Sequence, residues 1–413
     1  MKTKRTKTLL LTVIAMALSA SAYSAPNVSK TMSKSIDKVF VDYTKPDSPG
    51  CALAVYRDNN IWYQQGYGLA NIEHQVPIKP QSTVFDIGST SKQFMAASIL
   101  LLEQDGKLKT SDDIRKYLPE MPDYGHTITI NHLLHHTSGI RDYIALMMMA
   151  DIKEEDHATE AQALSVIARQ KALDFVPGSE HSYSNSGYFL MSQILQRVTG
   201  KSWVEFAQER LFKPLAMSHT QVLNNHKKII PNKAASYQLV GENEFGVQMS
   251  NWEQTGDGAV QTTVADLVKW DNNFYQPKVG GQWLVEQLQL KTTLSSGEEI
   301  AYARGLFLDQ YRGVKTVQHG GAWAGYRTEL IRVPAEKLSV AVLCNQAESN
   351  PTQLARGVLD VVLADKFSAL EKAQSISANN SEAPQAELQP VKNPEQYVGM
   401  YWSRKSGLVR QLE

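Results

Sequence analysis

Strand-rich segments lie near both ends of this chain and enclose a long helical middle. The runs "CALAVY" and "IWYQQGYG", joined by the turn "RDNN", predict a β-hairpin over residues 50–66. Helical signals dominate from about 106 to 298, and strands return in "RGLFLDQY", "VKTVQH", "YRTELIRV" and "LSVAVLCN" before a final helix. We therefore predict an α/β (α+β) fold with one antiparallel sheet built from both chain ends, flanked by helices, and an inserted all-helical lobe.

The first 25 residues have the features of a secretory signal peptide. An apolar run, Leu9–Ala20, precedes the small-residue stretch "SASAYSAP". A run of about a dozen residues is too short to span a bilayer, which needs roughly twenty. We expect cleavage after Ala22 or Ala25 and an exported protein, periplasmic or secreted, with an uncleaved anchor helix as the alternative. The basic residues before the run are Lys2, Lys4, Arg5 and Lys7.

The charge balance argues against nucleic-acid and membrane-surface partners. The chain has 42 Lys and Arg against 42 Asp and Glu, and the first 25 residues hold four of the basic ones and no acidic ones. The mature chain therefore carries a small negative net charge, which gives no electrostatic footprint for an anionic partner. We expect no nucleic acid partner and no stable membrane insertion, and the sequence leaves the oligomeric state open.

Two cysteines, Cys51 and Cys344, each lie in an apolar run that reads as a buried strand. We interpret them as buried thiols acting as small apolar side chains. A disulfide is the alternative, because an oxidising compartment permits one.

The stretch "FDIGSTSKQF" contains the first chemically informative pair. Ser89 and Lys92 follow a strand-like run and open an apolar helix that we expect to end at Gly106. Residues three apart share a helix face, and burial lowers the proton affinity of a lysine, so Lys92 is a candidate base for Ser89. The pattern alone is weak, since Ser35 and Lys38 match it too.

Two further short patterns follow in the chain. In "YSN", the hydroxyl of Tyr183 can relay a proton and the amide of Asn185 can hold the lysine and a substrate. In "HGGAWAG", glycines after His319 allow close approach of a substrate to the strand, and Ala322 N–H can join that of Ser89 as an oxyanion donor. A structural tyrosine and a glycine-rich turn are the alternative interpretations. The glycines are Gly320 and Gly321.

In this order, the three patterns resemble the serine hydrolases of the β-lactamase and penicillin-binding-protein superfamily. The resemblance is to the branch of class C β-lactamases, DD-peptidases, D-aminopeptidases and related esterases. It runs from about Gly50 to Phe367 and includes "LLHHTSGI" and "GDGAVQTTVADLVKW". It implies a β-lactamase/transpeptidase-like fold, with Ser89 as nucleophile, Lys92 as base, Tyr183 as proton relay and Asn185 as orienting group.

One departure from this resemblance concerns the substrate. Many β-lactamases and DD-peptidases of the superfamily have K-[ST]-G where this chain has His319-Gly320-Gly321. Histidine is mostly uncharged at neutral pH and is a weaker partner for a substrate carboxylate than lysine. The H-x-G form resembles D-aminopeptidases and esterases. Arg327 is a candidate replacement cation, and "KSG" at 405–407 lies in the final hairpin and is treated as coincidence.

The expected domain boundaries follow from these assignments. A hydrolase domain spans 26–372 after the signal peptide, with the helical lobe at about 106–298. Residues 373–395 are Ser, Asn and Pro-rich and predict a linker, and 396–413 predict a β-hairpin. The linker and hairpin resemble the start of a β-domain that some relatives append, so we expect a truncated chain.

We therefore predict an exported serine hydrolase that forms an acyl-enzyme on esters or D-amino-acid amides and peptides. A penicillin-binding DD-peptidase or a β-lactamase is the alternative, and a non-catalytic peptidoglycan- or penicillin-binding protein is the alternative of another class. We expect no metal and no organic cofactor. A metallohydrolase built on His132 and His136, four apart on an expected helix, lacks the glutamate that would follow the first histidine in zinc proteases.

Overall fold

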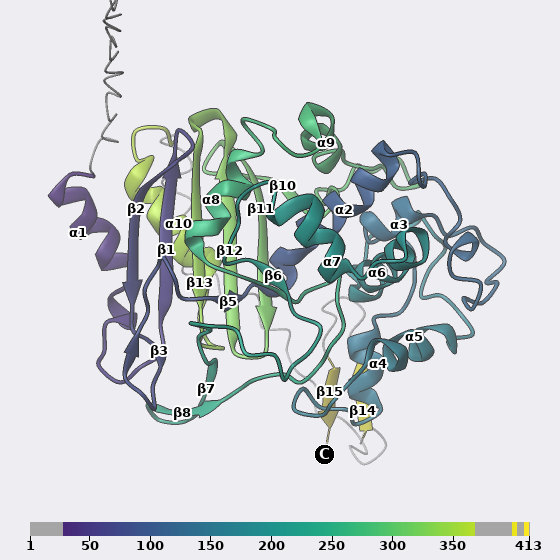
Figure 1. Cartoon of the computed structure of the whole chain (residues 1–413), viewed down its shortest axis with the longest axis horizontal. Coiled ribbons are helices and arrows are strands. Elements are labelled where there is room, and N and C mark those ends of the chain that lie inside the picture. Colours follow the sequence, from purple (N-terminus) through teal and green to yellow (C-terminus); the bar gives the residue numbers. More distant parts are fainter. Residues whose placement is uncertain (1–27, 368–398, 403–408, 413) are drawn as a thin grey trace, which may run out of the picture.

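A six-stranded antiparallel sheet occupies the left half of the molecule in the view of Figure 1. The computed structural model describes residues 28–367, 399–402 and 409–412. The strand order β10-β11-β12-β13-β1-β2 pairs β1 with β13, so the two ends of the chain share one sheet, as the sequence predicts. The strands are β1 (Cys51–Arg57), β2 (Asn60–Tyr67), β10 (Phe307–Tyr311), β11 (Val314–Trp323), β12 (Tyr326–Val333) and β13 (Leu338–Cys344).

Both faces of this sheet are covered by helices. Along β1, Leu53 and Val55 face a core shared with α1 (Lys30–Val39) and α10 (Pro351–Val362), while Ala52 and Ala54 face the larger core of the molecule. This alternation follows the two-residue period of a strand. On the second face, α8 (Val264–Asn272) packs against β1 and β13 (Figure 1). Every residue of β13 is therefore buried, which explains its apolar sequence; the exception is Ser339, whose Oγ donates to Asp271 Oδ1 at 2.9 Å.

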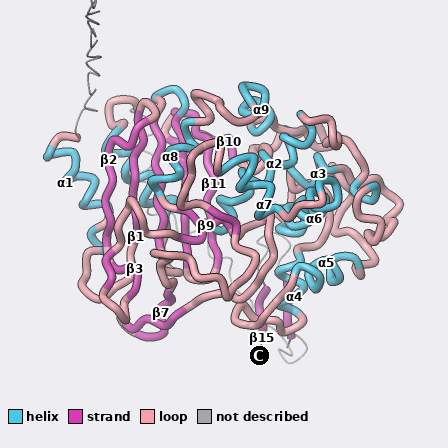
Figure 2. The backbone as a smooth tube through the Cα atoms, viewed as in Figure 1, coloured by secondary structure: helices cyan, strands magenta, loops and turns pink. Residues whose placement is uncertain are grey.

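The remaining helices gather beside the sheet, as the tube in Figure 2 shows. The segment 106–298, expected to be an all-helical lobe, also contains short strands, and its α8 packs on the sheet. The stretch around "DGAVQTTV" supplies β9, which pairs with β5 and β6. The helices are α2 (Lys92–Gln104), α3 (Ile130–Leu134), α4 (Tyr143–Met149), α5 (Glu160–Ala168), α6 (Asn185–Thr199), α7 (Trp203–Ala207) and α9 (Gly281–Leu288).

The short strands pair among themselves in small sheets separate from the six-stranded one. One of these small sheets contains Phe85–Asp86, just before the turn that carries Ser89. The short strands are β3 (Leu69–Asn71), β4 (Val76–Pro77), β5 (Phe85–Asp86), β6 (Gln221–Val222), β7 (Tyr237–Gly241), β8 (Glu244–Val247), β9 (Val260–Thr262), β14 (Gly399–Trp402) and β15 (Val409–Leu412).

Ser89 lies one turn before the buried helix that the sequence predicts it to open. Residues Gly88–Ser91 form a 3-10 turn, and α2 begins only at Lys92. Helix α2 is buried along nearly its whole length, from Lys92 to Leu102, which agrees with its apolar sequence. The nucleophile candidate therefore stands in the tight turn between β5 and α2.

The two cysteines form a disulfide, Cys51–Cys344, so the interpretation as buried free thiols is wrong. Cys51 is directly opposite Cys344 in the β1–β13 pair, with 4.0 Å between their Cα atoms. The sequence identified both strands but not their register, and the register decides whether the sulfur atoms meet. The disulfide joins two residues 293 positions apart.

The predicted signal peptide and the linker at 373–395 lie outside the described residues. Strands β14 and β15 pair as a hairpin where the sequence predicts one, and β15 lies beside α4. In the described part of the chain, no helix has both the length and the apolar character needed to cross a membrane.

Candidate active site

The turn that carries Ser89 is fastened to the edge of the sheet. Thr90 Oγ1 donates to the His319 carbonyl at 3.1 Å, and Thr328 Oγ1 donates to the Ile87 carbonyl at 2.9 Å. A Cβ atom on Gly321 would lie 2.0 Å from the Ile87 carbonyl oxygen, so only glycine permits this approach. Gly320 and Gly321 were predicted to let a substrate approach the strand closely, but at Gly321 the backbone of Ile87 takes this space, so Gly321 lets the nucleophile turn pack against β11.

Lys92 is the polar centre of the site. Its Nζ lies 3.1 Å from Ser89 Oγ, 2.8 Å from Asn185 Oδ1 and 2.7 Å from the Asp257 carbonyl oxygen. The side chain is fully buried, and burial lowers the pKa of Lys92 to about 8, while Asp257 and Asp142 act in the opposite direction. A lysine with this pKa has a substantial neutral fraction near neutral pH.

Asn185, the first residue of α6, is oriented by a carboxylate that the sequence analysis missed. Asp142 Oδ2 accepts from the Asn185 backbone N at 2.6 Å and from its Nδ2 at 2.9 Å. These bonds turn Oδ1 of Asn185 towards Lys92. Asp142 also caps α4, since its Oδ1 accepts from Ile144 N. Asp142 lies two residues after the end of "LLHHTSGI", but nothing local in the sequence shows that it meets residue 185.

Asp257 is the second carboxylate that the sequence did not single out. Its backbone carbonyl accepts from Lys92, and its Oδ2 accepts from the Tyr143 hydroxyl at 2.9 Å. Burial raises the pKa of Asp257 to about 6, with the charge of Lys92 opposing this shift. Asp257 therefore places a negative charge near Lys92 above about pH 6.

Tyr183 lies over the same lysine. Lys92 Nζ is 4.9 Å from the centre of the Tyr183 ring, and the ring of His136 packs on it with centroids 4.1 Å apart. The Tyr183 hydroxyl is buried and completes no hydrogen bond within the described residues. Burial raises the pKa of Tyr183 well above its usual value, and Ser89 lies near enough to act in the opposite direction. Tyr183 is therefore a protonated phenol at neutral pH.

His319 is buried behind the site. Its side chain is 2% exposed, its Nε2 is 3.1 Å from the Tyr302 hydroxyl, and its Nδ1 is 2.6 Å from the Gly320 carbonyl oxygen. Burial lowers the pKa of His319 to about 3, and the charge of Lys92 acts in the same direction. The histidine is therefore neutral at every pH relevant to activity. Its predicted contact with substrate stays a prediction.

An open cavity of about 760 Å³, its mouth included, adjoins this centre. Ser89, Asn185 and Ala322 line it together, which brings the predicted nucleophile, orienting amide and second oxyanion donor to one space. Lys233 also lines the cavity. Burial lowers the pKa of Lys233, and the nearby Asp86 acts in the opposite direction. Arg327 is outside this lining, where its guanidinium donates to the Ala324 and Tyr326 carbonyls at 2.7 Å.

The histidine pair considered as a zinc motif does not share a helix. Helix α3 ends at Leu134, and His136 follows it with a φ of 57°. His132 Nδ1 accepts from Thr129 N as part of a helix cap, and His136 Nδ1 accepts from Ser184 N. The two imidazoles are thus committed to separate structural roles, and the i,i+4 spacing was misread because the helix is shorter than expected.

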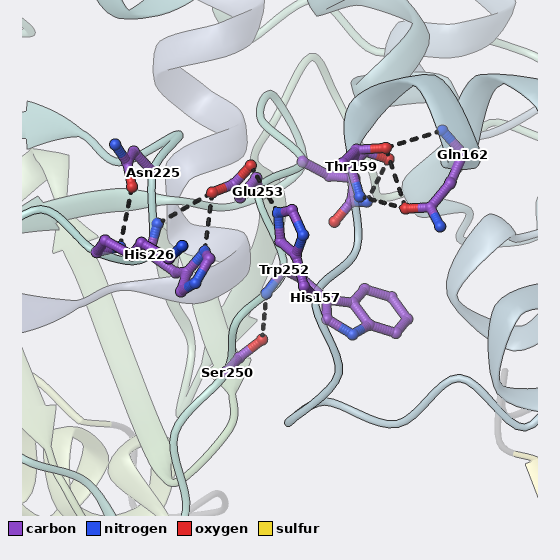
Figure 3. Close-up of polar contacts among 10 residues, drawn as sticks. His157, Thr159, Gln162, Asn225, His226, Ser250, Trp252 and Glu253 are labelled. Atoms are coloured by element: carbon purple, nitrogen blue, oxygen red, sulfur yellow. Dashed lines mark hydrogen bonds and ion pairs between the residues drawn. The ribbon is translucent and has the colours of Figure 1, made fainter.

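Three other metal-ligating side chains do converge, at the rim of the cavity. They are His157, His226 and Glu253 (Figure 3). They come from three separate segments, so no spacing in the sequence could have revealed them.

Comparison with known proteins assigns this chain to a family. The model of the family described as Beta-lactamase matches residues 36–364. The chain belongs to the Beta-lactamase family. It is 30% identical over 365 residues to a D-aminopeptidase of Gluconobacter oxydans (strain 621H), covering 88% of this chain and 65% of that protein. It is 30% identical over 314 residues to penicillin-binding protein 4* of Bacillus subtilis (strain 168), covering 72% of this chain and 68% of that protein.

A solved structure supports the same family fold. The octameric penicillin-binding protein homologue from Pyrococcus abyssi superposes with a TM-score of 0.72 at 24% identity, covering 85% of this chain and 81% of that one. The β-lactamase/transpeptidase-like fold expected from the sequence is confirmed. The chain spans 65% of the length of the Gluconobacter D-aminopeptidase.

Proposed function

We propose that this protein is an exported serine hydrolase that acts on D-amino-acid amides or peptides, or on esters, through an acyl-enzyme on Ser89. The observation that carries the proposal is the contact of the buried Lys92 Nζ with Ser89 Oγ at 3.1 Å. A serine hydroxyl is a weak nucleophile at neutral pH and needs an adjacent base. Lys92 is that base, because burial lowers its pKa to about 8.

Acylation begins with transfer of the Ser89 proton to Lys92 Nζ. The oxygen then attacks the substrate carbonyl carbon, and the carbonyl oxygen takes the negative charge. Backbone N–H groups of Ser89 and Ala322 are the proposed donors to this oxyanion. The sheet register supports the second donor: Trp323 and Tyr326 flank a two-residue turn, and Ala322 pairs with Arg327 next to them. A pair in that position leaves its N–H groups pointing away from the partner strand.

The leaving group departs with a proton from Tyr183. Its phenol is protonated at neutral pH, and the Ser89 side chain lies close enough to its hydroxyl to lower its pKa, against the larger effect of burial. Lys92 then returns its proton to Tyr183, which restores both groups. In deacylation, a water molecule gives a proton to neutral Lys92, and its oxygen attacks the ester carbonyl. Lys92 then returns this proton to Ser89 Oγ as the acyl–oxygen bond breaks, which releases the acid and restores the Ser89 hydroxyl.

The proposed substrate class rests on two observations. A relative at 30% identity is described as a D-aminopeptidase. The neutral, buried His319 replaces a permanent cation at the third motif, which disfavours substrates recognised mainly by a carboxylate at that position. We therefore rank D-amino-acid amides and esters ahead of β-lactams and peptidoglycan carboxypeptidase substrates.

A penicillin-binding peptidase is the second candidate function. The similarity to penicillin-binding protein 4* of Bacillus subtilis favours it, and Lys233 in the cavity lining is a candidate cation for a carboxylate. The proposed partner is thus a small amide, peptide or ester substrate. Export is proposed from the signal-peptide features and fits the Cys51–Cys344 disulfide, since such bonds persist in oxidising compartments.

The experiment that separates these functions compares turnover of matched substrates. D-alanine and L-alanine p-nitroanilides, an activated acetyl ester and a chromogenic cephalosporin are offered to wild type and to Ser89→Ala. The proposal predicts Ser89-dependent turnover with the D-amide or the ester preferred. A stoichiometric, Ser89-dependent reaction with the cephalosporin, without turnover of the D-amide or the ester, would favour the second candidate, and activity that persists in Ser89→Ala would contradict both.

A further inference from the structure

His157, His226 and Glu253 direct their polar atoms at one point beside the cavity (Figure 3). His226 Nδ1 lies 2.8 Å from Glu253 Oε1, and His157 Nε2 lies 3.1 Å from Glu253 Oε2. The three donor atoms all lie within 4.8 Å of one another. Donor atoms of a tetrahedral zinc site, with bonds of about 2.0–2.1 Å, lie about 3.3 Å apart. Small side-chain rotations therefore suffice to place the three donors around one ion.

The backbone holds two of these residues in fixed relative positions. Glu253 N donates to the Ala158 carbonyl at 2.9 Å, Asn251 N donates to the Glu154 carbonyl at 2.9 Å, and Trp252 Nε1 donates to the Lys153 carbonyl at 2.7 Å. These bonds fasten the strand-like segment 251–253 to 153–158. A preorganised frame of this kind is what a metal site requires of its surroundings.

His226 joins the frame from a third segment. Its backbone N donates to Glu253 Oε1 at 3.3 Å, and the turn that carries it is closed by Lys227 N donating to Asn225 Oδ1 at 2.9 Å. The His226 side chain is 17% exposed and that of His157 is 54% exposed. An ion can therefore reach the cluster from solvent.

We propose that His157, His226 and Glu253 form a binding site for a divalent transition metal ion of the zinc class. Imidazole nitrogens with one carboxylate oxygen suit zinc, cobalt, nickel or copper, whereas magnesium and calcium prefer oxygen ligands. Three protein ligands leave a coordination position for water or another small ligand. The site lies outside the Ser89 centre and does not depend on the proposed hydrolysis.

The position of the site gives the ion a structural effect on the cavity. His226 and Trp252 both line the cavity, and Trp252 packs against Trp323 with ring centroids 5.7 Å apart. A bound ion would cross-link the segments around 157, 226 and 253 and so fix this wall. The ion therefore stabilises the folded protein and the shape of the cavity mouth.

Calorimetric titration with ZnCl₂ tests the proposal on full-chain protein that carries no histidine tag and has been treated with EDTA and desalted. We expect one saturable zinc site per chain, no binding of Mg²⁺, and a rise in melting temperature with zinc, because a ligand of the folded state stabilises it. His157→Ala and His226→Ala should each weaken zinc binding by about a hundredfold, at the upper end of the losses seen for outer-shell changes.

His74→Ala is the matched control, since His74 is an exposed histidine away from the cluster. It should bind zinc as the wild type does. If His226→Ala melts lower than wild type in EDTA, its loss of zinc binding could reflect a weakened fold. The His157→Ala variant, at a more exposed side chain, then decides whether the cluster binds zinc. Absence of saturable zinc binding in the wild type, or equal binding in the His157→Ala/His226→Ala double variant, would overturn the proposal.

Discussion

Lys92 Nζ donates to the backbone carbonyl of Asp257 at 2.7 Å, so the base candidate and a buried carboxylate are joined through the main chain. The charge on the Asp257 side chain is thereby held near Lys92 and raises its pKa, against the larger effect of burial. The backbone contact persists when that side chain is neutralised. The charge can therefore be tested separately from the geometry.

The rate should depend on pH through Lys92. Because the neutral amine accepts the Ser89 proton, we expect kcat/KM to rise with pH and to level off above about 8, the pKa of Lys92. Asp257→Asn removes a charge that raises this pKa, so the rising limb should move to lower pH. Asp309→Asn, at an exposed carboxylate, is the control and should leave the profile in place. A shift to higher pH in Asp257→Asn would contradict the assignment.

Tyr183→Phe should separate catalysis from folding. The hydroxyl makes no hydrogen bond within the described chain, whereas the ring packs on His136, so the variant should melt at or above the wild-type temperature. Loss of the proton relay should lower kcat by about 10²–10⁴-fold.

Tyr188→Phe is the comparison for that experiment. Its hydroxyl donates to the Leu134 carbonyl at 2.9 Å, so its loss should destabilise the protein by about 1 kcal/mol. Melting curves and kcat for both variants check the contrast. A large stability loss with unchanged kcat in Tyr183→Phe would argue for a purely structural tyrosine.

Glu329 should limit stability at alkaline pH. Burial raises its pKa from 4.5 to about 7, so the folded protein favours the protonated carboxyl. Its destabilising effect is absent below pH 4.5, grows between 4.5 and 7, and is complete above 7. Glu329→Gln keeps an oxygen for Thr352 Oγ1, which donates at 2.6 Å. Urea unfolding should show the variant gaining relative to wild type from pH 5 to pH 8; a constant difference would refute the shift.

The Cys51–Cys344 disulfide should be a major stabilising element. It closes a loop across 293 positions, and its removal in Cys51→Ala/Cys344→Ala should lower the free energy of unfolding by about 2–5 kcal/mol. Denaturant unfolding measures the change. A reductant present during unfolding should lower the wild-type midpoint and leave the double variant unaffected, and equal midpoints for all four samples would count against the bond.

The sequence predicted the parts of this site that depend on local spacing. Ser89 and Lys92 are three apart, and the strands and the α2 helix around them have clear periodicity, so their proximity follows from helical geometry. The contact of Asn185 with Lys92 spans 93 positions, and it was expected from the resemblance to the β-lactamase and penicillin-binding-protein superfamily. The sheet was predictable because the segments near both ends of the chain have clear strand patterns.

Contacts between distant segments were not predictable from one sequence. Asp142 reaches Asn185 across 43 positions, and the Asp257 carbonyl reaches Lys92 across 165. The β1–β13 register that joins Cys51 to Cys344 is equally invisible. His319 was predicted to contact substrate, but its Nε2 lies 3.1 Å from the buried Tyr302 hydroxyl, and no pattern near residue 319 indicates that tyrosine.

The proposed mechanism requires that Ser89 becomes acylated. Intact-mass spectrometry of acid-quenched protein, after brief exposure to an activated ester or D-amino-acid ester, measures this directly beside Ser89→Ala. The proposed mechanism predicts a mass increase equal to one acyl group in wild type, formed more slowly in Tyr183→Phe and absent in Ser89→Ala. Substrate turnover with no acyl adduct in any quenched sample, or an adduct that persists in Ser89→Ala, would contradict it.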